Sequence, residues 1–120
     1  MKFITFVTTT NPAEAGSPPP ALMQAMVQLG MEAGARMVET GGMSDTATVK
    51  VRGKQMLTDG PFAETKELVG GYAIYELPSE AEIVAWAQRF AGLHRQHWPQ
   101  WEGEIAIQQF HNFGMPSRDR

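Results

Sequence analysis

The chain has 120 residues, of which 42% are hydrophobic, a formal net charge of −3 and no cysteine. This length fits one domain over residues 1–120, and the lack of cysteine excludes disulfide bonds, thiolate nucleophiles and cysteine-ligated metals. A weakly acidic chain without a basic stripe argues against nucleic acid as a partner, and its apolar runs are far too short to span a membrane. The first apolar run is also too short for a secretion signal, so we expect a cytoplasmic protein.

The first part of the chain predicts a strand, a helix and a second strand. β-branched and aromatic side chains predict a strand over residues 2–9, and a loop rich in Pro, Gly and Ser follows it. A helix is expected from Pro19-Pro20 to about Gly34. Its apolar stripe recurs at helical spacing and consists of Leu22, Met26, Leu29 and Ala33. Residues 36–40 then predict a short strand.

The second part predicts a hairpin and a further β-α-β unit. Alternating side chains over residues 46–52, a turn at Gly53 and a returning strand over residues 55–58 predict the hairpin. A long loop then leads to a strand over residues 70–77. Ser79 and Glu82 form a capping box at the start of an amphipathic helix, and residues 104–110 form the last strand.

Apart from the inserted hairpin, this order is the βαββαβ pattern of a ferredoxin-like α+β fold, with two helices on one face of an antiparallel sheet. Both faces of the sheet are apolar, since Phe3 and Val7 point to one face of the first strand and Ile4 and Phe6 to the other. Two helices cover one face only. We therefore expect a second copy of the sheet to cover the other face in a symmetric homodimer.

The loop between the hairpin and the following strand carries a family signature. It reads Thr58-Asp59-Gly60-Pro61-Phe62-Ala63-Glu64-Thr65-Lys66-Glu67 and runs on to Gly70-Gly71-Tyr72. This signature closely resembles that of the DGPF family, a branch of the YCII-related proteins, and the resemblance extends over nearly the whole chain. Residues 93–104 resemble a longer subgroup of that family. The resemblance implies a dimeric α/β barrel with a pocket between sheet and helices near the signature loop, and it implies no single reaction.

Asp59 is the first candidate for chemistry. A pocket carboxylate at this position would serve as a general acid or base. The alternative is an Asx turn, in which the side chain accepts N–H groups of the following residues and starts the turn led by Pro61. Within the same loop Phe62 is expected to line the pocket. Glu64 and Lys66 would contact a substrate, or would form an ordinary solvated charged loop.

His94 and His97 are the second candidates, because the i, i+3 spacing places both imidazoles on one side of a helix. Either ring could act as the acid–base partner of Asp59. A metal site would need a third ligand from Asp59, Glu102 or His111, and no diagnostic spacing supports one, so we expect no metal and no cofactor. The structural alternative is an exposed, frayed helix end. Trp98, beside them, is either a pocket wall or a core residue.

These residues predict a homodimer that binds a small molecule and performs cofactor-free acid–base chemistry of an isomerase or lyase type. Asp59 with His94 or His97 would be catalytic, and Phe62, Glu64, Lys66 and Trp98 would bind the substrate. The alternative is a non-catalytic dimeric protein that senses a ligand or assists another protein. No nucleic acid or membrane partner is expected.

Overall fold

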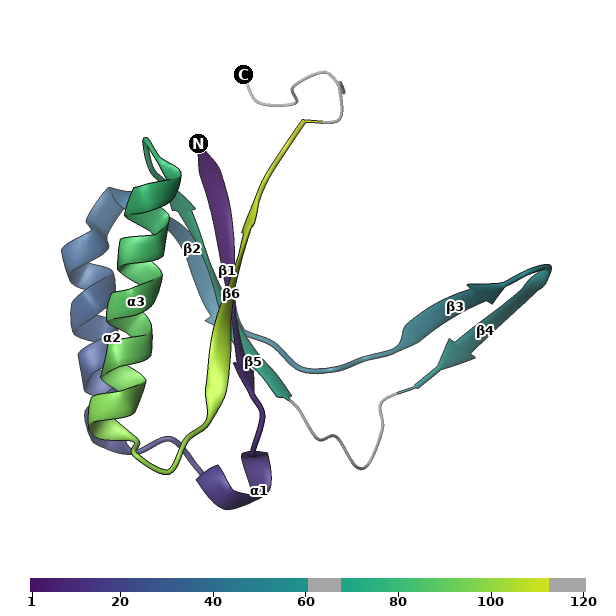
Figure 1. The fold of residues 1–120 in the computed structure, drawn as a ribbon, viewed down its shortest axis with the longest axis horizontal. Helices are drawn as coiled ribbons and strands as arrows, with labels where there is room; N and C mark the ends of the chain where they lie inside the picture. Colours follow the sequence, from purple (N-terminus) through teal and green to yellow (C-terminus); the bar gives the residue numbers. More distant parts are fainter. Residues whose placement is uncertain (61–67, 113–120) are drawn as a thin grey trace.

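The computed structural model describes residues 1–60 and 68–112, which form a four-stranded sheet, two long helices and a separate hairpin (Figure 1). Its elements in chain order are β1 (Lys2–Thr9), α1 (Pro12–Ala15), α2 (Pro20–Ala33), η1 (Gly34–Arg36), β2 (Met37–Gly42), β3 (Thr48–Arg52), β4 (Gln55–Asp59), β5 (Leu68–Glu76), α3 (Glu80–His97) and β6 (Gly103–Gln109). Every strand and long helix expected from the sequence is present. The helical turns α1 and η1 were not predicted.

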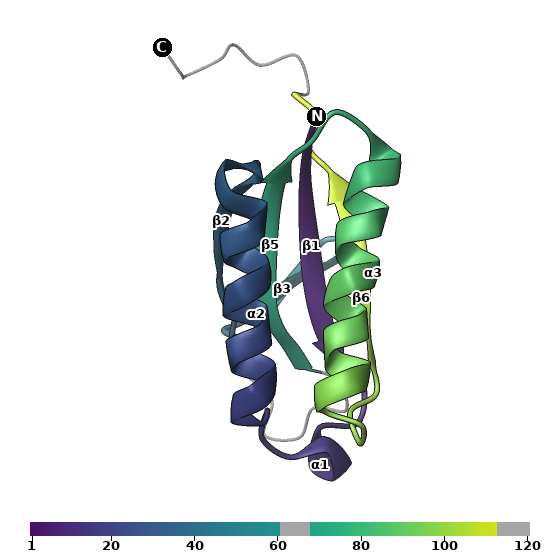
Figure 2. The same cartoon turned by 90° about the vertical axis from the view of Figure 1, so that its left-hand side faces the viewer.

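The main sheet has the strand order β2-β5-β1-β6, and every neighbouring pair in it is antiparallel. Apart from β3 and β4, the order of elements is β-α-β-β-α-β once the short turns α1 and η1 are set aside. This arrangement is compatible with the expected ferredoxin-like α+β fold. Figures 1 and 2 show that α2 and α3 lie side by side on one face of the sheet.

The core lies between that face and the two helices. The stripe predicted for α2 is confirmed, since Leu22, Leu29 and Ala33 are buried. Strands and helices contribute together to the main cluster, whose buried members are Phe3, Leu29, Ala33, Tyr75, Leu77, Ile83 and Trp86. The predicted N-cap of α3 is also confirmed, because the Ser79 hydroxyl accepts a hydrogen bond of 3.2 Å from the Glu82 N–H.

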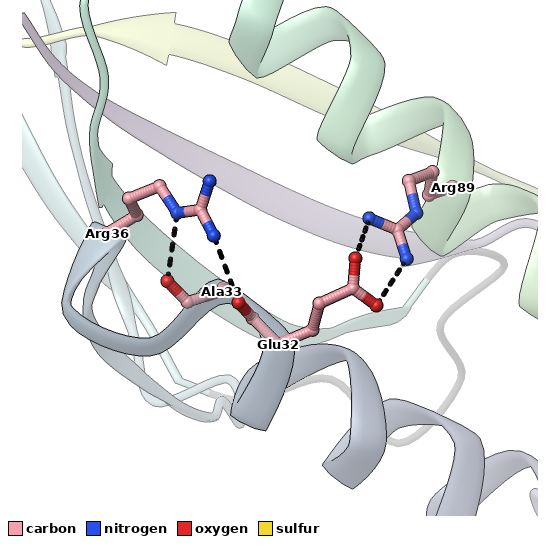
Figure 3. A network of polar contacts seen from close by, with 4 residues as sticks. All are labelled: Glu32, Ala33, Arg36 and Arg89. Atoms are coloured by element: carbon pink, nitrogen blue, oxygen red, sulfur yellow. Dashed lines mark hydrogen bonds and ion pairs between the residues drawn. The ribbon is translucent and has the colours of Figure 1, made fainter.

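Polar contacts on the outer surface connect the two helices (Figure 3). The guanidinium of Arg89 on α3 donates two hydrogen bonds, of 2.6 and 2.7 Å, to the carboxylate of Glu32 on α2. This charged hydrogen bond lowers the pKa of Glu32. Arg36 closes the end of α2 by donating to the carbonyls of Ala33 and Glu32. Because the side chains of Glu32 and Arg89 are about half exposed, this ion pair contributes little to stability.

The β3–β4 hairpin is a two-stranded sheet of its own, with Thr48 paired to Asp59 and Arg52 to Gln55. It turns at Gly53, where a φ of 60° favours glycine, as the sequence predicted. Figure 1 shows the hairpin projecting from the side of the main sheet that faces away from α2 and α3, and Figure 2 shows it behind the sheet. The hairpin is therefore separate from the helix-covered core.

Candidate functional site

The sheet face opposite the helices is the first candidate surface. The register of β1 with β5 and β6 shows that the side chains of Ile4, Phe6 and Ile74 point to this side of the sheet. These side chains are only half-buried, and none belongs to either hydrophobic core cluster. Among the described residues, no element packs on this open face. The two-sided apolar pattern expected from the sequence is thus present, with one side covered and one side open.

A polar pair lies within this open face. The hydroxyl of Tyr72 on β5 donates a hydrogen bond to the carboxylate of Glu39 on β2. This bond is the main cause that raises the pKa of Tyr72. Gly41 makes room for the tyrosine ring, because a Cβ at that position would lie 3.1 Å from Tyr72 Cε1. A hydroxyl donor and a carboxylate acceptor therefore share one patch with Ile74 and Phe6.

Sequence reasoning missed this pair. Glu39 and Tyr72 are 33 residues apart and match no short motif. The signal that indicates them is strand pairing: the antiparallel register sets Gly41 opposite Tyr72 and Glu39 opposite Ile74. Alternation alone predicts which face each residue occupies, but it does not predict which strands are neighbours.

Asp59 lies at the end of β4, on the hairpin. Its carboxylate Oδ2 is 3.0 Å from Lys50 Nζ, and the two side chains are 38% and 55% exposed. The carboxylate therefore holds a cross-strand ion pair at the base of the hairpin. Phe62, Glu64 and Lys66, predicted to contact a substrate, lie outside the described residues.

His94 is inside the molecule and only 3% exposed. Its Nδ1 is 3.0 Å from the carbonyl oxygen of Phe90, which can only accept, so Nδ1 carries the proton. The ring also packs on Phe90 and Trp101, with centroids 4.8 and 4.4 Å apart. Burial lowers the pKa of His94, which favours the neutral ring. These contacts correspond to the core environment of a structural histidine, and not to the exposed helix end considered from the sequence.

Trp98 is also a core residue, with 6% of its surface exposed. Its indole Nε1 donates a hydrogen bond of 3.0 Å to the carbonyl of Ala15 in α1. The neighbouring Trp101 donates one of 2.8 Å to the hydroxyl of Thr9 at the end of β1. The two tryptophans therefore fix the short helix α1 and the end of β1 against α3. This packing explains why the Pro-rich loop contains a helical turn.

His97 is half-buried and lies on the helix side of the sheet. It lines an open groove of about 650 Å³ along α2, together with Met23 and Val27. A second open groove, of about 520 Å³, runs between α2 and α3 beside Arg89 and Arg95. Over residues 1–60 and 68–112, no three His, Asp or Glu side chains cluster as a metal site would require.

Within one chain, the structure does not bring Asp59 together with His94 or His97. The hairpin that carries Asp59 is on the open side of the sheet, whereas α3 and its histidines are on the covered side. The Tyr72–Glu39 pair is on the same side of the sheet as the hairpin. Asp59 and this pair thus lie on the open side with the apolar patch, where the strand register also places Lys2 and Glu76.

Comparison with known proteins identifies the family. The YCII-related domain matches residues 2–93, which include all of β1 to β5 and most of α3. The match ends one residue before His94, so it does not cover the segment with both histidines, Trp98 and β6. None of the curated proteins matches the chain. No helix in the described part of the chain is long and apolar enough to cross a membrane. Because the match covers more than half of this chain, the chain belongs to the YCII-related family.

Proposed function

We propose that the chain forms a cytoplasmic homodimer in which the open faces of two sheets enclose a small-molecule site, as in a dimeric α/β barrel. The half-buried side chains Ile4, Phe6 and Ile74 support this arrangement, because a contiguous apolar sheet face exposed to water is unfavourable. A second copy is the simplest cover, since one interface then buries the same patch twice. The β3–β4 hairpin would be an insertion in this barrel.

The hydrogen bond between Tyr72 and Glu39 is the observation that carries the chemical part of the proposal. Enclosed by a second sheet, Glu39 would accept a proton from a carbon acid and Tyr72 would donate a hydrogen bond to the oxygen that becomes negative. The apolar neighbours Ile74 and Phe6 would exclude water from the substrate. The chemistry would be cofactor-free proton transfer, as in an isomerase or a lyase.

Asp59 enters the proposal as a second carboxylate of this site, because its hairpin lies on the open side of the sheet. Phe62, Glu64 and Lys66 would contact the substrate from the signature loop. The Tyr72–Glu39 pair takes the place of His94 or His97 as the partner of Asp59. The His94 ring is held by aromatic packing and by the Phe90 carbonyl, and both histidines lie across the sheet.

The test is hydrogen–deuterium exchange catalysed in D2O, which reports proton transfer without knowledge of the natural substrate. A set of small enolisable ketones and lactones is incubated with the protein, and loss of the α-proton signals is followed by proton NMR. The wild type should accelerate exchange for at least one compound. Glu39→Gln should slow that exchange by about 100-fold or more, because it removes the general base.

His97→Gln is the matched control, because it changes a titratable side chain on the covered side of the sheet. It should exchange at the wild-type rate. Tyr72→Phe should retain part of the rate, since the base remains and only the hydrogen-bond donor is lost. An equal rate in the wild type and Glu39→Gln would contradict the assignment of Glu39 as the base.

A non-catalytic ligand-binding or accessory protein is the second candidate function. The observation that favours it is the burial of His94, since one of the two histidines considered for chemistry is used for packing. In that case compounds would shift the amide signals of β1 and β5 without any exchange of their α-protons. The same sample therefore distinguishes the two functions.

A further inference from the structure

One face of the β3–β4 hairpin is mainly apolar, and the other is mainly polar and charged but includes Leu57. The strand register sets Val49 opposite Thr58 and Val51 opposite Met56, so these four side chains share a face. Val49, Val51 and Met56 are 60%, 70% and 71% exposed. Apart from Leu57 on the opposite face, this alternation is typical of strands that pack on another surface with one face. In the described part of the chain, no other element makes such a surface for this hairpin.

A hairpin of this size is not expected to persist alone in water. Two strands of five residues have a single ladder of hydrogen bonds, and isolated two-stranded hairpins are marginally stable at best. Here the hairpin projects from the open side of the sheet instead of folding onto its own helices (Figure 1). Its apolar face therefore needs a cover that the helix-covered half of the same chain does not supply.

The charges indicate what that cover is. Residues 48–59 contain Lys50, Arg52 and Lys54 against the single acidic residue Asp59, which gives a formal charge of +2. Since the whole chain carries −3, the remaining residues carry −5. A basic arm is electrostatically attracted to the acidic body of another copy of the same chain. The uncovered sheet face of that copy adds apolar surface on the side to which the arm points.

We propose that the β3–β4 hairpin is an arm whose apolar face, formed by Val49, Val51 and Met56, packs on a second copy of this chain. The inference rests on the homodimer proposed above. It adds a hairpin contact to the contact between the two sheets. In a two-fold dimer each copy would extend one arm to the other, so the contact of Val49, Val51 and Met56 would occur twice per dimer. The opposite face, with Lys50, Arg52, Gln55 and Leu57, would stay in solvent.

The first experiment compares two substitutions that add the same charge to opposite faces of the hairpin. Val51→Lys places an ammonium on the apolar face, whereas Gln55→Lys places one on the polar face next to it. Sedimentation equilibrium should show a dimer for the wild type and for Gln55→Lys. The dimer dissociation constant of Val51→Lys should be at least about 10-fold higher, because a charge would be buried without a partner. Equal dimer dissociation constants for the two variants would overturn the proposal that the hairpin is a dimer arm.

The second experiment uses the absence of cysteine, which lets a single introduced thiol carry a probe. Val51→Cys and Gln55→Cys are each labelled with a benzophenone maleimide, mixed with unlabelled 15N-enriched protein and irradiated. Mass spectrometry should find cross-links from position 51 to 15N peptides, and far fewer from position 55. Cross-links from position 51 to its own chain alone would overturn the proposal, because the hairpin would then fold back on its own sheet.

The results also separate failure of the arm from failure of the homodimer. A wild-type chain that sediments as a monomer at micromolar concentration contradicts both. A dimer that withstands Val51→Lys but dissociates with Phe6→Lys, on the open sheet face, contradicts the arm and leaves the homodimer in place. Far-UV circular dichroism of Val51→Lys should match that of the wild type, which shows that the variant is folded.

Discussion

The hairpin β3–β4 and the aromatic end of α3 make opposite use of apolar side chains. Val51 and Met56 on the hairpin are 70% and 71% exposed, whereas Trp98 after α3 is 6% exposed and hydrogen-bonded. Both segments lie next to candidate catalytic residues, Asp59 in the first and His94 in the second. The comparison teaches that one region buries its apolar side chains within a single chain, whereas the other leaves them exposed among the described residues.

The difference also bears on function. His94 Nδ1 and the indole N–H groups of Trp98 and Trp101 have hydrogen-bond partners within the chain, and no buried side-chain polar atom among the described residues lacks one. A site for a ligand needs polar groups that are free to exchange partners. The open side of the sheet, with Glu39 and Tyr72 at the surface, meets that condition better than the helix end does.

The largest expected effect is at the aromatic end of α3. Trp98→Ala should lower the free energy of unfolding by about 3–5 kcal/mol, because it removes a buried indole and leaves the Ala15 carbonyl without its donor. Urea unfolding followed by circular dichroism measures the change. Met31→Ala is the control, since its side chain is 72% exposed on α2 and its effect should stay within about 0.5 kcal/mol. Equal losses in the two variants would contradict the buried role of Trp98.

His94 should give a smaller, pH-dependent effect. His94→Gln should cost about 1–3 kcal/mol at neutral pH through lost ring packing and a weakened hydrogen bond. Burial lowers the pKa of His94 in the folded chain below the ordinary value of 6.5, so the unfolded chain binds the proton more readily. The contribution of this residue is therefore full above that value and is lost as the pH falls below it.

Denaturant unfolding across neutral and mildly acidic pH tests this sign. The wild type should lose stability on acidification, and His94→Gln should lose less of it over the same pH interval. His97→Gln, one helical turn further on, should retain the acid sensitivity of the wild type. If His94→Gln and the wild type have parallel pH profiles, the buried neutral imidazole is not the source of the acid sensitivity.

We expect a still smaller effect on the free energy of unfolding from changes at the start of α3. Ser79→Ala should cost about 1 kcal/mol, because the Glu82 N–H loses the hydroxyl that caps it. Ser79→Asp should restore most of the loss, since a carboxylate caps the same N–H and interacts favourably with the helix dipole. Thermal unfolding of the three proteins in parallel is sufficient. A loss in Ser79→Asp as large as in Ser79→Ala would show that the hydroxyl is needed for another contact.

The hairpin should show the smallest effect on folding. Asp59→Asn breaks an exposed ion pair with Lys50 and should change the free energy of unfolding by about 0.5 kcal/mol or less. Lys50→Gln should change it by a similar amount, and high salt should remove the difference in both cases. A much larger loss confined to Asp59→Asn would favour the turn-holding role of this carboxylate over a catalytic one.

The sequence by itself determined the strands, the two long helices and the helix-covered core. The apolar stripe that includes Leu22 and Leu29 is set by local spacing, and the Ser79 cap by a contact three residues away, so both were readable from the chain. The family was also recognisable from the signature that begins at Thr58, and the YCII-related domain match confirms it. These features depend on neighbours in sequence.

Only the tertiary structure decided which polar residues meet. The Glu39–Tyr72 pair depends on β2 lying beside β5, and the burial of His94 depends on Trp101 returning from beyond the helix end. The separation of Asp59 from His94 depends on which side of the sheet the hairpin leaves. The physical reason is that side-chain periodicity sets the face a residue occupies, whereas strand order and long-range packing set what stands opposite it.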